Sequence, residues 1–295
     1  MAWTFDELYG RDNKFLDGLE ELDQSFVAEV PTTFHGWVIK PEVRVIPRRT
    51  KETRGRKSKP KVVKPKRSSE VCNLLKYSPA LREKRWERYR IKDTTKGPQV
   101  WEVKWCSFWR KSDGGLPTKK HCLIVARNVE TKEIKYFVSN LVPGVRGATV
   151  RQLLSIAFSR WSVESCFRTA KEELGLDHFE VRGWRCIHRH WRITQLAQLF
   201  CARVRQEFDP NPTSEFQQVT MEQVRSAMNA WLTTVGQTPK AKLETLKAEL
   251  DIQAYYQKRN EQARKSHTKT KRKKLTEMRI NPDKIKSCKP KRDQL

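Results

Sequence analysis

The chain has 295 residues, 37% of them hydrophobic, which is enough for one large domain or two small ones. Its formal net charge of +27 excludes a typical enzyme of neutral substrates and favours a polyanionic partner, nucleic acid above all. There is neither a signal-peptide pattern nor an apolar run of the roughly 18 residues that a spanning helix needs. We therefore expect a soluble intracellular protein without a membrane partner. The seven cysteines are scattered and never spaced as CxxC, which fits a reducing compartment.

The amino-terminal segment predicts a strand–helix–strand unit. The stretch AWTFDELYGRDNKFLDGLEELDQSFVAEVP contains the end of a short strand, a turn at Tyr9-Gly10, a helix over residues 12–22 and a strand over residues 25–30. We interpret this pattern as a βαβ fragment.

A strongly basic segment occupies residues 48–67. Its sequence, RRTKETRGRKSKPKVVKPKR, is dense in Lys and Arg, and Pro60 and Pro65 interrupt any regular element, so we expect a flexible loop. Two roles stay open for this loop, a solvated linker and a direct DNA contact. The second is suggested by RGRK, which resembles a minor-groove hook.

Three β-rich runs, QVWEVKWCSFWRKSDGG, KHCLIVARN and EIKYFVSN, occupy residues 99–140 and predict an antiparallel meander. Trp101, Trp105 and Trp109 share one face of the first strand, because side chains in a strand alternate with period two. A base-stacking platform is one interpretation of these rings. We favour the other, a buried sheet face.

The sequence after Pro143 has the periodicity of amphipathic helices. The helix HWRITQLAQLFCARV is apolar nearly all round, which predicts burial. Thr220 and Gln223 form a plausible capping box. The basic tail, residues 266–295, is expected to be disordered without a polyanion. The helices expected are residues 149–174, 190–208, 221–232 and 240–265.

The helix expected over residues 149–174 carries charges at the border between core and solvent. Arg160, Glu164 and Lys171 lie along one edge of it. One interpretation is an ion pair between Arg160 and Glu164 that stabilises the helix by about 0.3–0.5 kcal/mol. The other is a metal ligand beside phosphate-binding cations. The core face is expected to contain Leu153, Ile156, Val163, Phe167, Ala170 and Leu174.

This region resembles a known family. RWSVESCFRTAKEELGLDHFEVRGW followed by IHRHWRITQLAQLF is similar to the C-terminal part of the DDE transposases of bacterial insertion sequences, of the insertion-sequence-701 type within the insertion-sequence-4-like group. Those proteins carry a Tyr-x2-Arg-x3-Glu-x6-Lys signature around their last catalytic acid. The chain has Arg160-x3-Glu164-x6-Lys171, with Ala157 in the place of the tyrosine.

Two further segments carry the resemblance. FDELYGRDNKFLDGLEELDQSFVAEVP is similar to the segment around the family's second catalytic aspartate, which maps to Asp6. VTMEQVRSAMNAWL with YYQKRNEQARKSH gives a weaker similarity, so that the resemblance covers most of the chain outside the basic loop and tail.

The resemblance implies DNA transposition by phosphoryl transfer with two divalent cations, Mg2+ or Mn2+. It implies that Asp6 and Glu164 are catalytic residues and metal ligands. For Trp161, packing between helices is the alternative to DNA contact. The partners implied are double-stranded DNA at transposon ends and target, and a second copy in a synaptic complex, in the bacterial cytoplasm at the nucleoid. The DNA-binding residues implied are Arg160, Lys171, Arg168 and Trp161.

The fold implied is α/β, a partial ribonuclease H-like core of the retroviral integrase superfamily that lacks its first strands. The family's first aspartate lies upstream of the segment that matches Asp6. We therefore expect the chain to be incomplete and inactive alone, unless a companion amino-terminal transposase chain supplies that acid and covers the open strand edges. The expected divisions are 1–35 (partial core), 36–145 (inserted β region), 146–210 (catalytic-helix region), 211–265 (C-terminal helices) and 266–295 (tail).

Two other functions stay open. A non-catalytic DNA-binding remnant of a transposase would bind duplex through the basic loop, Arg160, Lys171 and the tail. A basic RNA-binding or ribosome-associated protein would explain the charge but not the spacing of Arg160, Glu164 and Lys171. We do not expect zinc at a third cluster, because its members lack the usual ligand spacing. They are His178, Cys186, His188 and His190.

Overall fold

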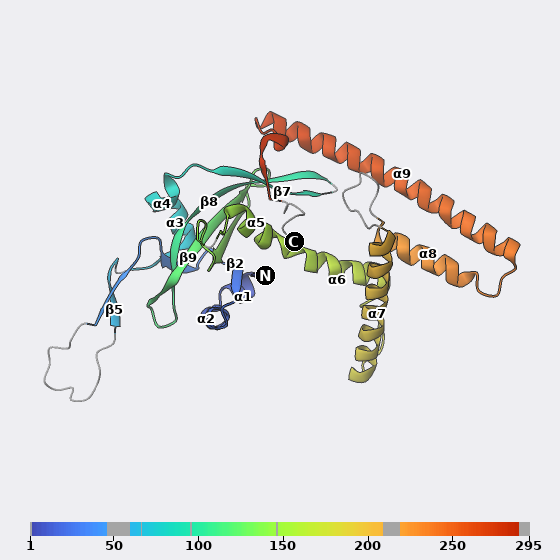
Figure 1. Cartoon of the computed structure of the whole chain (residues 1–295), viewed down its shortest axis with the longest axis horizontal. Helices are drawn as coiled ribbons and strands as arrows, with labels where there is room; N and C mark the ends of the chain where they lie inside the picture. The colour runs from blue at the N-terminus through green and yellow to red at the C-terminus, as the bar shows by residue number, and fades with distance from the viewer. Residues whose placement is uncertain are drawn as a thin grey trace. The chain divides into compact units, whose positions relative to one another are not determined.

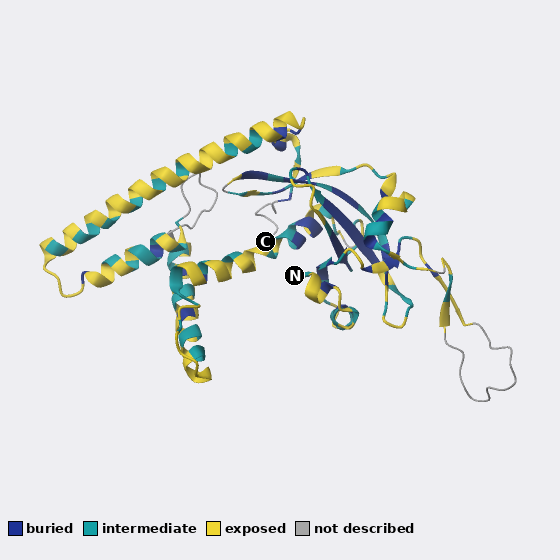
Figure 2. Cartoon of the chain, turned by 180° about the vertical axis from the view of Figure 1, so that it is seen from behind, coloured by how far each residue is buried: buried dark blue, intermediate teal, exposed yellow. Residues whose placement is uncertain are grey.

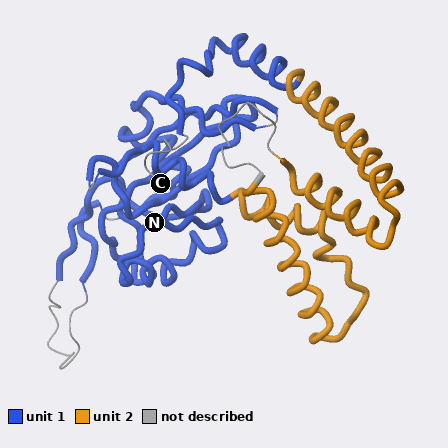
Figure 3. The backbone as a smooth tube through the Cα atoms, turned by 45° about the vertical axis from the view of Figure 1, so that its right-hand side comes forward, with its two compact units in different colours: residues 1–160, 267–295 blue, residues 161–266 orange. Residues whose placement is uncertain are grey.

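The computed structural model describes residues 2–45, 60–65, 67–94, 96–145, 147–208 and 219–288. Most of the expected basic loop and the end of the tail lie outside these residues. The chain divides into two compact units, residues 1–160 with 267–295 and residues 161–266 (Figure 3). Across the described residues, no helix combines the length and apolar character that a membrane span requires.

The elements of the first unit begin as the sequence predicts, with a strand, a helical segment and a parallel strand. The strands are β1 (Ala2–Phe5), β2 (Ser25–Val30), β3 (His35–Trp37), β4 (Glu42–Val45), β5 (Pro60–Lys64), β6 (Ser69–Glu70), β7 (Glu87–Thr94), β8 (Gly97–Lys111), β9 (Pro117–Asn128), β10 (Ile134–Ser139) and β11 (Lys286–Ser287). Its helices are α1 (Glu7–Gly10), α2 (Asn13–Glu21), α3 (Val71–Tyr77), α4 (Pro79–Arg82) and α5 (Val150–Ser159), with a 3-10 turn at Pro282–Lys284.

A mixed sheet organises the first unit (Figure 1). Its order, among the described strands, is β1-β2-β10-β9-β8-β3-β6, while β7 pairs with β8 and β11 with β7. β1 and β2 are parallel, which confirms the predicted βαβ fragment, and β8, β9 and β10 form the predicted antiparallel meander. β4 and β5 pair separately as a two-stranded ribbon.

The meander continues the sheet of the amino-terminal strands. β10 pairs antiparallel with β2 and places Val138 opposite Ala28. A strand of the expected core, β2, and a strand of the expected inserted region, β10, are thus paired in one sheet, and the expected division stays a prediction. We expected open edges on both amino-terminal strands, but the second edge of β2 is covered by β10. β1 is the edge strand on this side of the described sheet.

Helices cover both faces of the sheet, and the side chains of β2 show why. Phe26 faces the cluster that includes Leu16 of α2 and residues of α3 and α4, whereas Val27 faces the cluster that includes Leu153 of α5. Successive side chains of β2 are thus buried on opposite faces of the sheet, as expected for a strand that is covered on both faces. Figure 2 shows the strands as the most buried part of the unit. Trp101 is buried and Trp105 packs beside it, as predicted for a buried sheet face.

The second unit contains helices with large exposed apolar side chains. Its elements are α6 (Trp161–Leu174), α7 (Trp184–Phe208), α8 (Met221–Thr233) and most of α9 (Pro239–Glu277). α8 begins at the predicted capping box of Thr220 and Gln223. The predicted burial of the apolar helix is wrong, because Ile193 of α7 is 67% exposed. Val163 and Phe167, expected on a core face, are 55% and 58% exposed, whereas Ala170 is buried.

The basic tail differs from its expected disorder over residues 266–288. α9 continues to Glu277, and the chain then forms the 3-10 turn and β11. Leu275 is fully buried in a cluster with Val100, Val129 and Ile280. A few apolar side chains therefore order a segment whose overall composition predicts disorder.

Candidate functional site

Asp6 lies at the carboxyl end of β1, where it is the N-cap of α1. Its Oδ1 accepts hydrogen bonds from the backbone N–H groups of Leu8 (3.1 Å) and Tyr9 (3.4 Å). This is the ordinary capping role of an aspartate. Within the described part of the chain, no hydrogen bond to the other carboxylate oxygen is recorded, so this oxygen can serve as a ligand.

Gly10 determines how closely α1 approaches the sheet. A Cβ atom at this position would overlap the carbonyl oxygen of Glu29 in β2. Glycine is therefore required at the end of α1, and this contact fixes the helical turn that Asp6 caps. The turn predicted at Tyr9-Gly10 is thus a short helix packed on β2.

The expected catalytic helix is interrupted at Arg160. α5 ends at Ser159, α6 begins at Trp161, and the boundary between the two units falls at the same point. Arg160 is half-buried at the C-cap of α5, and Ala157, at the position where the resemblance implies a tyrosine, is buried in the core cluster of α5.

The other predicted residues lie on α6 in the second unit, and all are exposed. Glu164 is in the first turn of α6 and Lys171 in its last turn. The guanidinium of Arg168 lies 5.5 Å from the ring centroid of Trp161, which is 47% exposed. A cation and an aromatic ring are thus paired on the surface of this helix.

The structure does not assemble a complete metal site from the described residues. No group of three or more His, Cys, Asp or Glu side chains that could hold a metal ion occurs among them, the histidines and cysteine of residues 178–190 included. Asp6 belongs to the first unit and Glu164 to the second.

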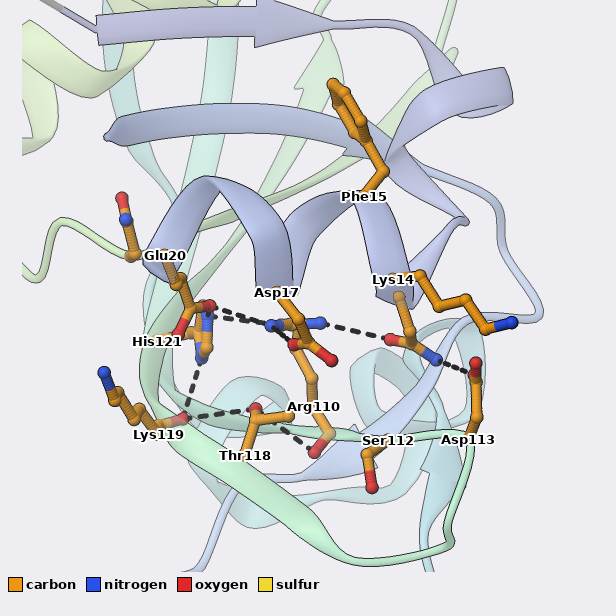
Figure 4. Close-up of polar contacts among 12 residues, drawn as sticks. Lys14, Phe15, Asp17, Glu20, Arg110, Ser112, Asp113, Thr118, Lys119 and His121 are labelled. Carbon is orange, nitrogen blue, oxygen red and sulfur yellow. Dashed lines mark hydrogen bonds and ion pairs between the residues drawn. The ribbon is translucent and has the colours of Figure 1, made fainter. Parts of the chain in front are cut away.

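A buried polar network in the first unit was not predicted from the sequence (Figure 4). Arg110 of β8 is fully buried, and its Nη2 donates to Asp17 Oδ1 (2.7 Å) and Glu20 Oε1 (2.8 Å) of α2. Its Nη1 donates to Asn13 Oδ1 (3.1 Å). His121 of β9 places Nε2 at 2.6 Å from the same Glu20 oxygen. The network therefore joins α2 to the β8–β9 hairpin.

Glu20 is the most strongly perturbed carboxylate of this network. Burial by itself would raise its pKa, but the hydrogen bonds and charges of His121 and Arg110 outweigh this effect and lower the pKa to about 2. Glu20 is therefore ionised in the folded protein at neutral pH. Arg110 is fully buried and Glu20 is 11% exposed, so the pair positions the hairpin on α2, because removal of Glu20 would leave a buried cation with less compensation.

A cavity of about 630 Å³ opens near the end of β2 and the beginning of α1. Its lining starts at Glu7, the residue after Asp6, and includes the cations Arg11 and Lys111 and the carboxylate of Asp113. Asp113 accepts a hydrogen bond of 2.9 Å from Asn13, a member of the polar network. The network thus supports one wall of a charged cavity that begins at the residue after Asp6.

Residues 2–98, about one third of the chain, match the family described as DDE superfamily endonuclease. A search of curated proteins found no match. The matched segment contains Asp6 but not Glu164. The amino-terminal third of the chain is therefore similar to the nuclease domain of DDE-type transposases.

Proposed function

We propose that the chain is the C-terminal part of a DDE transposase of the insertion-sequence-701 type and takes part in metal-dependent cleavage and transfer of DNA strands. The observation that carries this proposal is the position of Asp6. It ends a strand of a parallel βαβ unit within the segment that is similar to DDE superfamily endonucleases. The edge of a sheet at the carboxyl ends of parallel strands is a common place for catalytic groups.

Asp6 and Glu164 are the proposed metal ligands. Carboxylate oxygens are the hard ligands that Mg2+ and Mn2+ prefer, and Asp6 retains an oxygen beyond the one that caps α1. When bound, two such cations activate the attacking water or 3′-hydroxyl and stabilise the leaving oxygen. The exposed carboxylate of Glu164 is chemically suited to the same role.

Cations on and beside α6 are proposed to hold the DNA. Arg160 and Lys171 would bind phosphates near the scissile bond, since both are cationic and Lys171 is exposed. Arg168 and Trp161 would contact the duplex beside them as the surface pair already described. Such contacts position the strand and carry no base specificity of their own.

A third acid is needed to complete the ligand set. We propose that it comes from a companion transposase segment whose strand pairs with β1, the edge strand of the described sheet. The chain by itself would then bind DNA without cutting it. In a synaptic complex the active form would be a homodimer.

The test is cleavage of an oligonucleotide that carries the element's end sequence, with Mg2+ or Mn2+. We expect binding without cutting by the chain alone, and binding that weakens steeply as salt rises. Cutting that is abolished by Glu164→Gln would overturn the proposed incompleteness. If the chain binds DNA, and neither divalent metal nor the substitution of Asp6 or Glu164 changes that binding, the non-catalytic DNA-binding remnant is favoured.

A further inference from the structure

We infer that the first turns of α7 form a binding site for an unpaired DNA base and its flanking phosphates. The site consists of Trp184, Arg185, His188, Arg189 and Arg192, which line one cavity of about 330 Å³. The chemistry of the site indicates a stacked ring and several anions. That the ligand is DNA rests on the proposed function.

The three arginines point into one cavity because of their spacing. Positions 185, 189 and 192 are separated by four and three residues, so they lie on one face of the helix. Seven residues of helix extend about 10 Å, which is close to the length of three nucleotides of one strand at about 3.4 Å each. The cations can therefore follow successive phosphates.

The charges of these arginines are not neutralised within the described part of the chain. All three are exposed, and no ion pair or hydrogen bond of their side chains is recorded there. Arg225 of α8, in contrast, is paired with Glu173 at 3.1 Å. The first turn of α7 contains no acidic residue, and the partial positive charge of a helix amino terminus adds to the attraction for an anion.

An aromatic surface lies beside the cations. Trp184 is 72% exposed, and its ring centroid is 4.0 Å from that of His188, which in turn is 5.5 Å from that of Trp191. An exposed indole held by a neighbouring ring at the edge of a basic cavity is the arrangement on which a base stacks.

His188 contributes to the site through its ring, which contacts the indole of Trp184. Its Nε2 is shielded from solvent, so a ligand in the cavity does not reach this atom. Stacking needs an unpaired base, so the site favours single-stranded over duplex DNA.

The test is binding of a fluorescent single-stranded oligonucleotide and of its blunt duplex to the full chain in EDTA. Trp184→Ala should weaken single-strand binding by about 5- to 100-fold, the range expected for loss of one stacked base. Trp184→Phe should restore most of the affinity, and duplex binding should change little. Because no divalent metal is present, the result does not depend on whether Asp6 and Glu164 are catalytic.

The arginines are tested by the salt dependence of the same binding. Replacing Arg185, Arg189 and Arg192 together with alanine should reduce the slope of log affinity against log salt by about 2, at about 0.7 for each phosphate contact on a single strand. The matched control replaces three exposed lysines of α9 with alanine and should reduce this slope less. The inference is overturned by an unchanged single-strand affinity in Trp184→Ala, or by equal effects of the two triple variants. The control positions are Lys242, Lys247 and Lys258.

Discussion

Arg110 Nη2 donates to Glu20 Oε1 over 2.8 Å, in a position where the arginine side chain is fully buried. This bond joins β8 to α2, two elements that lie about 90 residues apart in the sequence. It therefore belongs to the contacts that hold the β8–β9 hairpin against α2.

Arg110→Met should destabilise the chain strongly. The substitution leaves Asp17 and Glu20 without their shared cation, and breaking a buried charge pair costs about 3–5 kcal/mol. The free energy of unfolding, measured by urea denaturation, should fall by this amount. Arg85→Met, at an exposed position, should change it by less than about 0.5 kcal/mol. Equal stability of the two variants would show that the network does not hold the fold.

The free energy of unfolding should depend on pH in the acid range because of Glu20. Its pKa is lowered in the folded state to about 2 from 4.5, so the stabilisation is fully present above pH 4.5 and is lost as pH falls towards 2. The shift corresponds to roughly 3 kcal/mol at neutral pH, for a side chain that is 11% exposed.

Glu20→Gln tests this dependence. The variant should be less stable at pH 7 and lose less stability between pH 4.5 and 2 than the unmodified chain. Glu21→Gln, on an exposed position of the same helix, is the control and should retain the full acid dependence. If Glu20→Gln and the unmodified chain lose the same free energy of unfolding between pH 4.5 and 2, Glu20 does not have this role.

Two glycines of the first unit should respond in opposite directions to alanine. Gly10→Ala brings a Cβ against the carbonyl oxygen of Glu29 and should cost about 1–3 kcal/mol or more. Gly18→Ala, in the middle of α2 with open space around it, should stabilise by about 0.5–1 kcal/mol. Thermal denaturation distinguishes the two, and a neutral Gly10→Ala would mean that α1 does not pack closely on β2.

The end of α9 should contribute to the stability of the first unit. Leu275→Ala removes a fully buried side chain from the cluster with Val100 and Val129 and should cost about 2–5 kcal/mol. Lys274→Ala, at the exposed neighbouring position, should have little effect. If Leu275→Ala is as stable as the unmodified chain, residues 267–288 do not fold onto the sheet.

The strands could be predicted from the sequence because their information is local. β2 and the meander contain β-rich apolar runs bounded by turn residues, and both form as predicted. The Arg110 network could not be predicted, because it joins residues about 90 to 101 positions apart and only the sheet brings them together. The spacing of Asp17 and Glu20 on one face of α2 was a signal, but nothing local identified Arg110 as their partner.

Burial was predicted poorly in the second unit. Helical periodicity correctly groups Val163 and Phe167 on one face, but a period does not say whether another element covers that face. Both side chains are exposed. The site residues of α6 were named from a family resemblance, and their roles stay predictions.

Binding of Mn2+ to the DNA-bound chain, followed by electron paramagnetic resonance, tests the proposal that Asp6 and Glu164 are metal ligands. Asp12→Asn and Glu172→Gln are matched controls, since Asp12 caps α2 as Asp6 caps α1 and Glu172 is exposed on α6 like Glu164. We predict that Asp6→Asn and Glu164→Gln each weaken Mn2+ binding at least about tenfold, while the controls do not. Unchanged Mn2+ affinity in both Asp6→Asn and Glu164→Gln would contradict the account.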